Sequence, residues 1–101
     1  KPAEFPGGQT AWQEFLKKNL NSDVGILMGA PAGTYMVIVR FVIGKNGALR
    51  NFAAETKFGY GMEIEAIRVI KESPKWIPAF QNGHPVNSYL RQPITYVVRS
   101  K

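Results

Sequence analysis

The sequence contains no cysteine, and only one histidine and one aspartate, among its 101 residues. The absence of cysteine excludes disulfides, thiolate metal sites and a cysteine nucleophile. No acidic residue lies near His84 in the sequence to form a triad with it, and no residues have the spacing of metal ligands. The composition therefore predicts a protein that is not an enzyme and that uses no cofactor or metal.

Long apolar runs are also missing. A helix that spans a bilayer needs roughly 20 apolar residues, and the longest apolar run here, 34–43, is interrupted by Arg40. The chain begins at Lys1 and not at a methionine, which is expected of a processed or truncated product, so a signal or anchor segment can precede it. A length of 101 residues suits one domain with one modest core. We expect residues 1–101 to form it, with 1–8 as an extended lead-in.

The net charge of +6 is large for this length. Such a charge is found in proteins that bind nucleic acid, anionic membrane surfaces or acidic partners. The thirteen lysines and arginines are scattered, however, and Lys17-Lys18 is the only adjacent pair. This pattern favours a solvated basic surface over a dedicated nucleic-acid site.

The most strand-like segment is 34–43, in which one face is wholly apolar and the other nearly so. This pattern is typical of a strand that is covered on both faces or flanked on both sides. The dipeptide Asn46-Gly47 follows, and Asn-Gly between two apolar runs is a strong hairpin signal. We therefore expect 48–56 to run antiparallel to the first strand, with Phe52 opposite Phe41 if the loop has two residues.

Two further segments have the periodicity of amphipathic helices. The first, about 9–20, repeats its apolar residues at helical spacing: Ala11, Trp12, Phe15, Leu16 and Leu20. The second, about 62–72, does so with Met62, Ala66, Ile67, Val69 and Ile70, and it ends before Pro74. The segment 21–33 between the first helix and the first strand has no regular pattern, and it is glycine-rich from 25 to 33. Beyond a helical turn at Ile26-Leu27-Met28, its conformation is not predicted.

The last predicted strand covers 86–98 and follows a second Asn-Gly turn at 82–83. Apolar and polar residues alternate along it, and Pro93 interrupts the pattern. Because proline cannot donate to a ladder, it marks an edge strand or a bulge.

The order helix, strand, strand, helix, strand predicts an α+β fold, a sandwich of two layers. The second helix returns the chain to the top of the hairpin, so the last strand pairs best with the free side of the central strand. The predicted sheet is three-stranded and antiparallel in the order 48–56, 34–43, 86–98. Its last strand is then a long open edge, and an extended peptide can add to such an edge through backbone hydrogen bonds.

The sequence resembles the C-terminal domain of TonB, the energy transducer of bacterial envelopes. The matching motifs, in chain order, are Phe5-Pro6-Gly7-Gly8, Ala11-Trp12, Phe15-Leu16, Gly33-Thr34, Gly47, Glu65-Ala66, Pro74-Lys75-Trp76-Ile77-Pro78, Gln81-Asn82-Gly83-His84-Pro85-Val86 and Pro93-Ile94. One segment departs from the family pattern, since Asn21-Ser22-Asp23-Val24 stands where a Tyr-Pro pair is usual.

The resemblance implies a periplasmic domain that is anchored to the inner membrane by an N-terminal helix and works with ExbB and ExbD. It would grip the TonB box, a short peptide of an outer-membrane transporter, and so couple the proton-motive force to substrate uptake. The family's peptide-binding strand corresponds to the following residues here: Tyr89, Leu90, Arg91, Gln92, Ile94, Thr95, Tyr96, Val97 and Val98. Arg91 and Arg99 are candidates to attract acidic residues near the box.

Two other functions remain open from the sequence. The same type of domain can serve as a docking or sensor module of a membrane signalling or peptidase protein. The net charge by itself suggests a third function, that of a basic module that binds nucleic acid. A long open edge also permits a homodimer by strand exchange.

Overall fold

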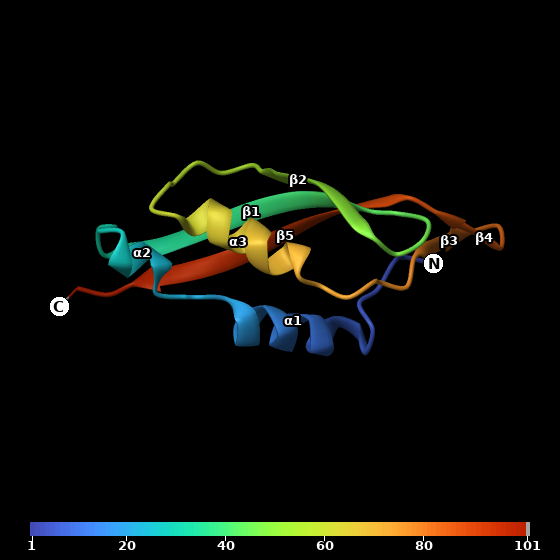
Figure 1. Ribbon diagram of the computed structural model, residues 1–101, viewed down its shortest axis with the longest axis horizontal. Coiled ribbons are helices and arrows are strands. Elements are labelled where there is room, and N and C mark those ends of the chain that lie inside the picture. Colours follow the sequence, from blue (N-terminus) through green and yellow to red (C-terminus); the bar gives the residue numbers. More distant parts are fainter. Residues whose placement is uncertain (101) are drawn as a thin grey trace.

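The computed structural model describes residues 1–100 as two layers, an antiparallel sheet and a helical layer on one side of it (Figure 1). The elements in chain order are α1 (Gly8–Asn19), α2 (Val24–Leu27), β1 (Gly33–Ile43), β2 (Leu49–Ala54), α3 (Met62–Lys71), β3 (Ala79–Gln81), β4 (His84–Val86) and β5 (Ser88–Val98). The main sheet has the order β2-β1-β5, so the predicted α+β fold and strand order are confirmed.

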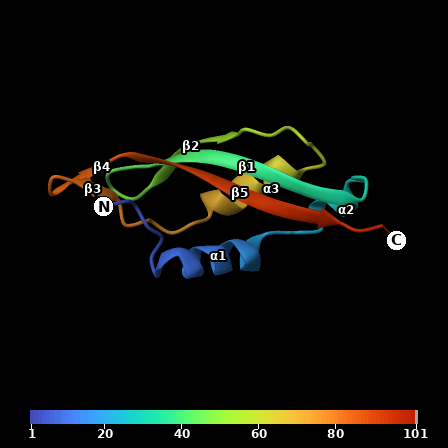
Figure 2. The same cartoon turned by 180° about the vertical axis from the view of Figure 1, so that it is seen from behind.

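The helical layer covers one face of the sheet. Helix α3 lies over the strands, and α1 lies alongside it on the β5 side (Figure 1). Seen from behind, β1 and β5 have no helix over them (Figure 2). The core between the layers contains these residues: Phe5, Trp12, Leu16, Val37, Val39, Phe41, Ile43, Met62, Ala66, Val69, Ile70, Trp76, Ile94, Tyr96 and Val98. Strand β1 is therefore flanked on both sides but covered on one face only.

The β1–β2 hairpin differs from the predicted one in its loop. Val39 lies opposite Ala54, but the register shifts by one residue toward the turn, so that Ile43 lies opposite Leu49. A bulge causes the shift, and its residue Asn51 has a positive φ of 59°. The two-residue loop and the regular pairing of Phe52 with Phe41 were therefore wrong, although the two rings still stack with centroids 6.0 Å apart.

The segment before β5 forms a second, two-stranded sheet that was not predicted. Strands β3 and β4 pair around Asn82 and Gly83, which have φ values of 52° and 78°, as an Asn-Gly hairpin turn requires. Val86 belongs to this small sheet and not to the last long strand, which begins at Ser88. Asn87 lies between β4 and β5 and belongs to neither strand, and its Oδ1 accepts a hydrogen bond from the N–H of Lys45.

The first helix begins and ends within one residue of its predicted range, and the residues before it contact the segment after α3. The N–H and carbonyl of Glu4 pair with Ile77 at 3.0 and 2.9 Å, which ties the lead-in to the segment after α3. The domain measures 53 × 23 × 17 Å, with its N-terminus near the β3–β4 end and α2 at the other end (Figure 1). Among the helices of residues 1–100, none has the length and apolarity to cross a bilayer.

Candidate functional site

Strand β5 forms one edge of the sheet, and its pairing with β1 determines which of its backbone groups stay free. The two strands pair without a break from Gly33 opposite Val98 to Ile43 opposite Ser88. Successive residues of an antiparallel strand direct their backbone N–H and carbonyl groups to alternate sides. If the side to which the backbone groups of one residue point is known, the sides for all other residues of the two strands follow.

Ile38 supplies that direction. Its N–H donates to Oγ1 of Thr56 at 3.3 Å, and its carbonyl accepts the N–H of Glu55 at 2.8 Å. Both groups of Ile38 thus face the β2 side, so its partner Pro93 directs its backbone away from β1, toward the open edge. The same alternation turns Tyr89, Arg91, Thr95 and Val97 to this edge: no turn or loop within residues 1–100 bonds their backbone.

Pro93 interrupts the open edge without breaking the strand. It has no N–H, and its carbonyl already accepts a hydrogen bond from Nε2 of Gln92 at 2.8 Å. The proline therefore sits where its missing donor costs the β1 ladder nothing, as expected for an edge strand. What remains free for a partner is one stretch at Tyr89–Arg91 and another at Thr95–Val97.

The nine residues predicted as the binding strand fall into two groups. Tyr89, Arg91, Thr95 and Val97 have exposed side chains and edge-facing backbone groups. The others, Leu90, Gln92, Ile94, Tyr96 and Val98, pair their backbone with β1 and direct their side chains toward the helical layer. The structure thus brings the nine into one strand but leaves only alternate residues able to offer backbone hydrogen bonds.

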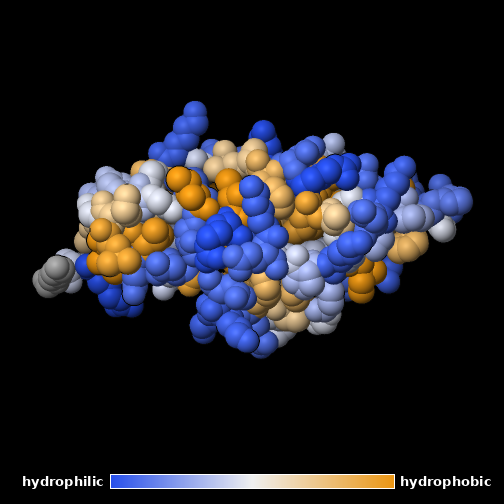
Figure 3. All heavy atoms as spheres, viewed as in Figure 1, coloured by the Kyte–Doolittle hydropathy of each residue, from blue (hydrophilic) through white to orange (hydrophobic). Residues whose placement is uncertain are grey.

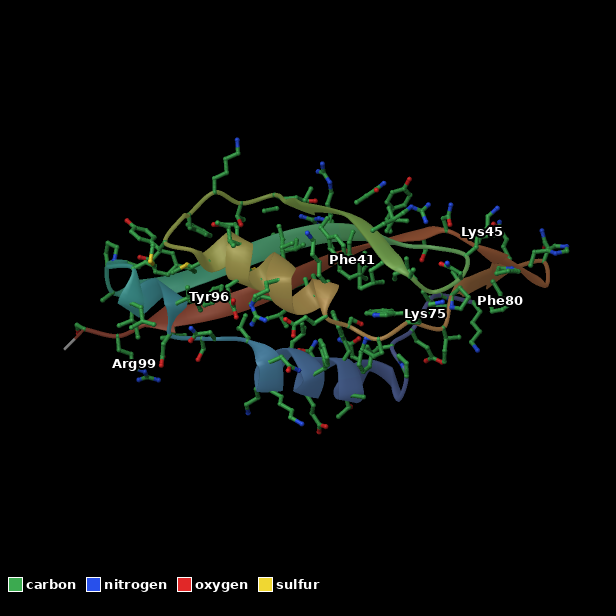
Figure 4. The ribbon with its side chains drawn as sticks, in the orientation of Figure 1. Phe41, Lys45, Lys75, Phe80, Tyr96 and Arg99 are labelled. Carbon is green, nitrogen blue, oxygen red and sulfur yellow. The ribbon has the colours of Figure 1, made fainter. Side chains whose placement is uncertain are left out.

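The inward-facing side chains anchor β5 to the helices. The hydroxyl of Tyr96 donates to the carbonyl of Met62 at 2.9 Å, and burial raises the pKa of Tyr96 above its ordinary value. Figure 4 shows this side chain between the sheet and α3. Gln92, which is 6% exposed, accepts a hydrogen bond at Oε1 from the indole Nε1 of Trp12 at 2.7 Å. Strand β5 is therefore a rigid edge.

The outward-facing Arg91 is held across the sheet. Its Nε and Nη2 lie 3.0 and 2.8 Å from Oε1 of Glu55, and Arg40 lies 4.0 Å from the same carboxylate. The hydrogen bonds from Arg91 lower the pKa of Glu55 below its ordinary value. The Arg91 guanidinium is therefore engaged with Glu55, whereas Arg99 follows the end of β5, at the opposite end of the domain from Lys45 and Phe80 (Figure 4).

A groove borders the open edge on its helical side. It has a volume of about 450 Å³ and lies between α1 and β5. Its walls are formed by Gln13, Leu16, Lys17, Leu20, Ser22, Pro93, Ile94 and Thr95. Because α1 lies beyond β5 in both views (Figures 1 and 2), a strand added to this edge would pass over α1 and this groove.

The opposite edge of the sheet is less suited to pairing. Strand β2 has six residues, against eleven in β5, and carries the bulge at Asn51. Short, bulged edges resist the addition of a further strand. The structure therefore distinguishes the two edges in length and regularity.

Another exposed apolar area covers the α2 end of the domain (Figure 3). Its exposed members are Ile26, Leu27, Met28, Phe58 and Tyr60. Helix α2 packs closely against Met62 here, and Gly25 permits this because any larger residue would place a Cβ that overlaps the Met62 methyl group.

In the part of the chain that the structure describes, no group of three or more histidine, aspartate or glutamate residues is placed to hold a metal ion.

The comparisons with known proteins decide the family. Residues 36–98, most of the chain, match the model of the Gram-negative bacterial TonB protein C-terminal family. The chain belongs to this TonB C-terminal family. The comparisons with curated proteins and with solved structures gave no match. The match extends from β1 to the end of β5 and so includes the open edge. The chain is thus a TonB-type C-terminal domain, which is a periplasmic domain type, and domains of this family are interaction modules that contact outer-membrane transporters.

Two features of the edge were missed from the sequence, namely the alternation that leaves only Tyr89, Arg91, Thr95 and Val97 able to offer backbone groups, and the groove beside α1. The alternation could have been inferred from the sequence. Once 86–98 is placed at the edge, a proline in an unbroken ladder has to face outward, and the alternate residues follow. No sequence pattern indicates the groove, because the groove depends on how far α1 lies from β5.

Proposed function

We propose that this domain binds the TonB box of an outer-membrane transporter by adding the box as a further strand beside β5. The observation that carries the proposal is the eleven-residue open edge, where the backbone groups of Tyr89, Arg91, Thr95 and Val97 face away from β1 and have no partner among residues 1–100. Main-chain hydrogen bonds give affinity in this mode of recognition, and alternate side chains give specificity.

In the whole transducer, an N-terminal helix outside this chain anchors the protein in the inner membrane and engages ExbB and ExbD. The domain then couples the proton-motive force to uptake through the bound transporter. Membership of the TonB C-terminal family supports this role. The ladder between β1 and β5 would transmit the force, because β5 is held to the rest of the domain by β1 and by the contacts of Gln92 and Tyr96.

The same edge also supports a homodimer in which two copies of β5 pair or exchange. Such a dimer would compete with the TonB box for the same backbone groups. Peptide binding is therefore expected to weaken self-association at high protein concentration.

Backbone NMR during titration with a synthetic TonB-box peptide tests the proposal. We expect the amide shifts to concentrate between Tyr89 and Val98. Shifts confined to β2, or no binding at millimolar peptide, would exclude binding at the β5 edge. A scrambled peptide of the same composition serves as the control, and it is expected to bind at least about tenfold more weakly.

A further inference from the structure

The open edge of β5 is not uniform, because Pro93 divides it into an N-terminal and a C-terminal half. At Pro93 an added strand finds no N–H, and the carbonyl that it meets already accepts a hydrogen bond from Gln92. A peptide therefore gains backbone hydrogen bonds at Tyr89 and Arg91, or at Thr95 and Val97, but not across the middle.

The two halves differ in what lies beneath an added strand. In the N-terminal half the helical side is closed at Gln92 by the indole of Trp12. In the C-terminal half the groove runs between α1 and the edge, and Pro93, Ile94 and Thr95 form its wall on β5. Alternate side chains of a strand added there would point down into this groove.

The chemistry of the groove defines its occupant. Leu16 and Leu20 of α1 and Ile94 of β5 offer an apolar surface, and Lys17 adds a positive charge in the same wall. Arg99 follows directly after this half of the edge, and both cations are exposed. An extended peptide with an apolar side chain in the groove and an acidic side chain beside it complements both features.

We propose that the partner peptide pairs with the C-terminal half of the edge, at Thr95 and Val97, and places an apolar and an acidic side chain over the groove between α1 and β5. This inference rests on the proposed function and specifies the segment and the peptide chemistry. Lys17 acts as a specificity-determining residue, whereas Tyr89 and Arg91 contribute little to affinity.

A pair of proline variants tests the choice of half. Val97→Pro and Tyr89→Pro each remove one edge-facing N–H and leave the β1 ladder intact, because both residues direct their backbone outward. The probe is the capped synthetic peptide Thr-Glu-Thr-Leu-Thr-Leu-Thr, and the readout is its dissociation constant. We expect Val97→Pro to weaken binding about tenfold or more and Tyr89→Pro to change it less than about twofold.

A pair of charge variants tests the groove. Lys17→Glu reverses a charge in the groove wall, and Lys18→Glu reverses its exposed neighbour, which does not line the groove. Lys17→Glu is expected to weaken binding of the glutamate peptide about two- to fivefold. It is also expected to strengthen binding of a matched peptide with lysine in place of glutamate. The effect of Lys18→Glu on both peptides is expected to be smaller.

The outcomes separate this inference from the proposed function. A larger loss with Tyr89→Pro, equal losses with both prolines, or equal effects of the two charge variants would overturn the inference while leaving edge binding in place. Binding that neither proline changes would overturn both, because the edge would then not be used. No binding of the wild-type domain to this peptide or to a TonB-box peptide would also overturn both.

Discussion

The indole Nε1 of Trp12 donates a hydrogen bond of 2.7 Å to Oε1 of Gln92, and this contact joins helix α1 to the edge strand. Both residues are buried, at 1% and 6% exposure. The contact also orients the Gln92 amide, so that its Nε2 reaches the carbonyl of Pro93. This interaction thus links α1 to the residue of β5 that bonds the Pro93 carbonyl at the open edge.

Replacement of Trp12 by phenylalanine is expected to lower the free energy of unfolding by at least about 2 kcal/mol. The variant leaves a buried amide oxygen without its donor and also loses ring volume. Urea unfolding measures the loss. Trp76→Phe is the matched control, since its indole donates to Ser73 in a partly exposed position where water can substitute. Equal losses in the two variants would contradict a special role for the Gln92 contact.

Gly47 at the tip of the β1–β2 hairpin supports a close approach to a distant segment. Its φ is +84°, its carbonyl accepts the N–H of Trp76 at 2.9 Å, and a Cβ would overlap the Trp76 backbone. Gly47→Ala is expected to destabilise the domain by about 2 kcal/mol or more. Gly83→Ala, with φ +78° and open space around it, isolates the conformational cost of about 1 kcal/mol. If thermal unfolding shows the same loss for both, the contact with Trp76 has no energetic role.

Glu65 makes the stability of the domain depend on pH. Arg68 donates to both its oxygens at 2.7 Å and, together with the N–H of Asn21, lowers the pKa of Glu65 below its ordinary 4.5 against the opposing effect of burial. The unfolded chain therefore binds the proton first as the pH falls. The stabilisation from this group is complete above about pH 5 and is lost as the pH drops through the folded pKa.

Glu65→Gln is expected to be less stable than the wild type near about pH 7 and to lose less stability between about pH 5 and about pH 3. Urea unfolding at several pH values provides the comparison. Glu14→Gln, on the exposed face of α1, should keep the wild-type profile. A Glu65→Gln profile parallel to that of the wild type would contradict the assignment.

Pro93 is expected to protect the edge from pairing with itself. Pro93→Ala adds an outward-facing N–H and makes the row of edge donors continuous, so self-association should increase. Sedimentation velocity at high protein concentration measures the change, with Pro85→Ala in the small β3–β4 sheet as the control. Unchanged sedimentation of Pro93→Ala would show that the proline has no protective effect.

Much of the fold could be predicted from the sequence because local patterns and chain direction agree. The periodicity of α1 and α3, the apolar faces of β1, the alternation of β5 and the return of the chain through α3 were sufficient for the order β2-β1-β5. The details that failed depend on tertiary contacts. The Asn51 bulge and the longer loop accompany the docking of Gly47 on Trp76, which no local pattern reveals.

The candidate site was predictable as a strand but not as a surface. Glu65 and Arg68 have the i,i+3 spacing of an ordinary exposed helix pair. In the structure, however, Glu65 is 9% exposed and also accepts the N–H of Asn21, while Arg68 reaches the carbonyl of Asn19. These contacts hold the end of α1 against α3 and so help to define the groove beside β5. A groove of this kind results from the packing of elements distant in sequence.

Amide hydrogen exchange of the domain with and without a TonB-box peptide tests the central claim most directly. In the free protein, the amides of Thr95 and Val97 should exchange rapidly and those of Ile94 and Tyr96 slowly, because only the latter pair is bonded to β1. With saturating peptide, exchange at Thr95 and Val97 should slow by at least about tenfold. Protection that appears only in β2, or no new protection at saturation, would contradict binding at the β5 edge.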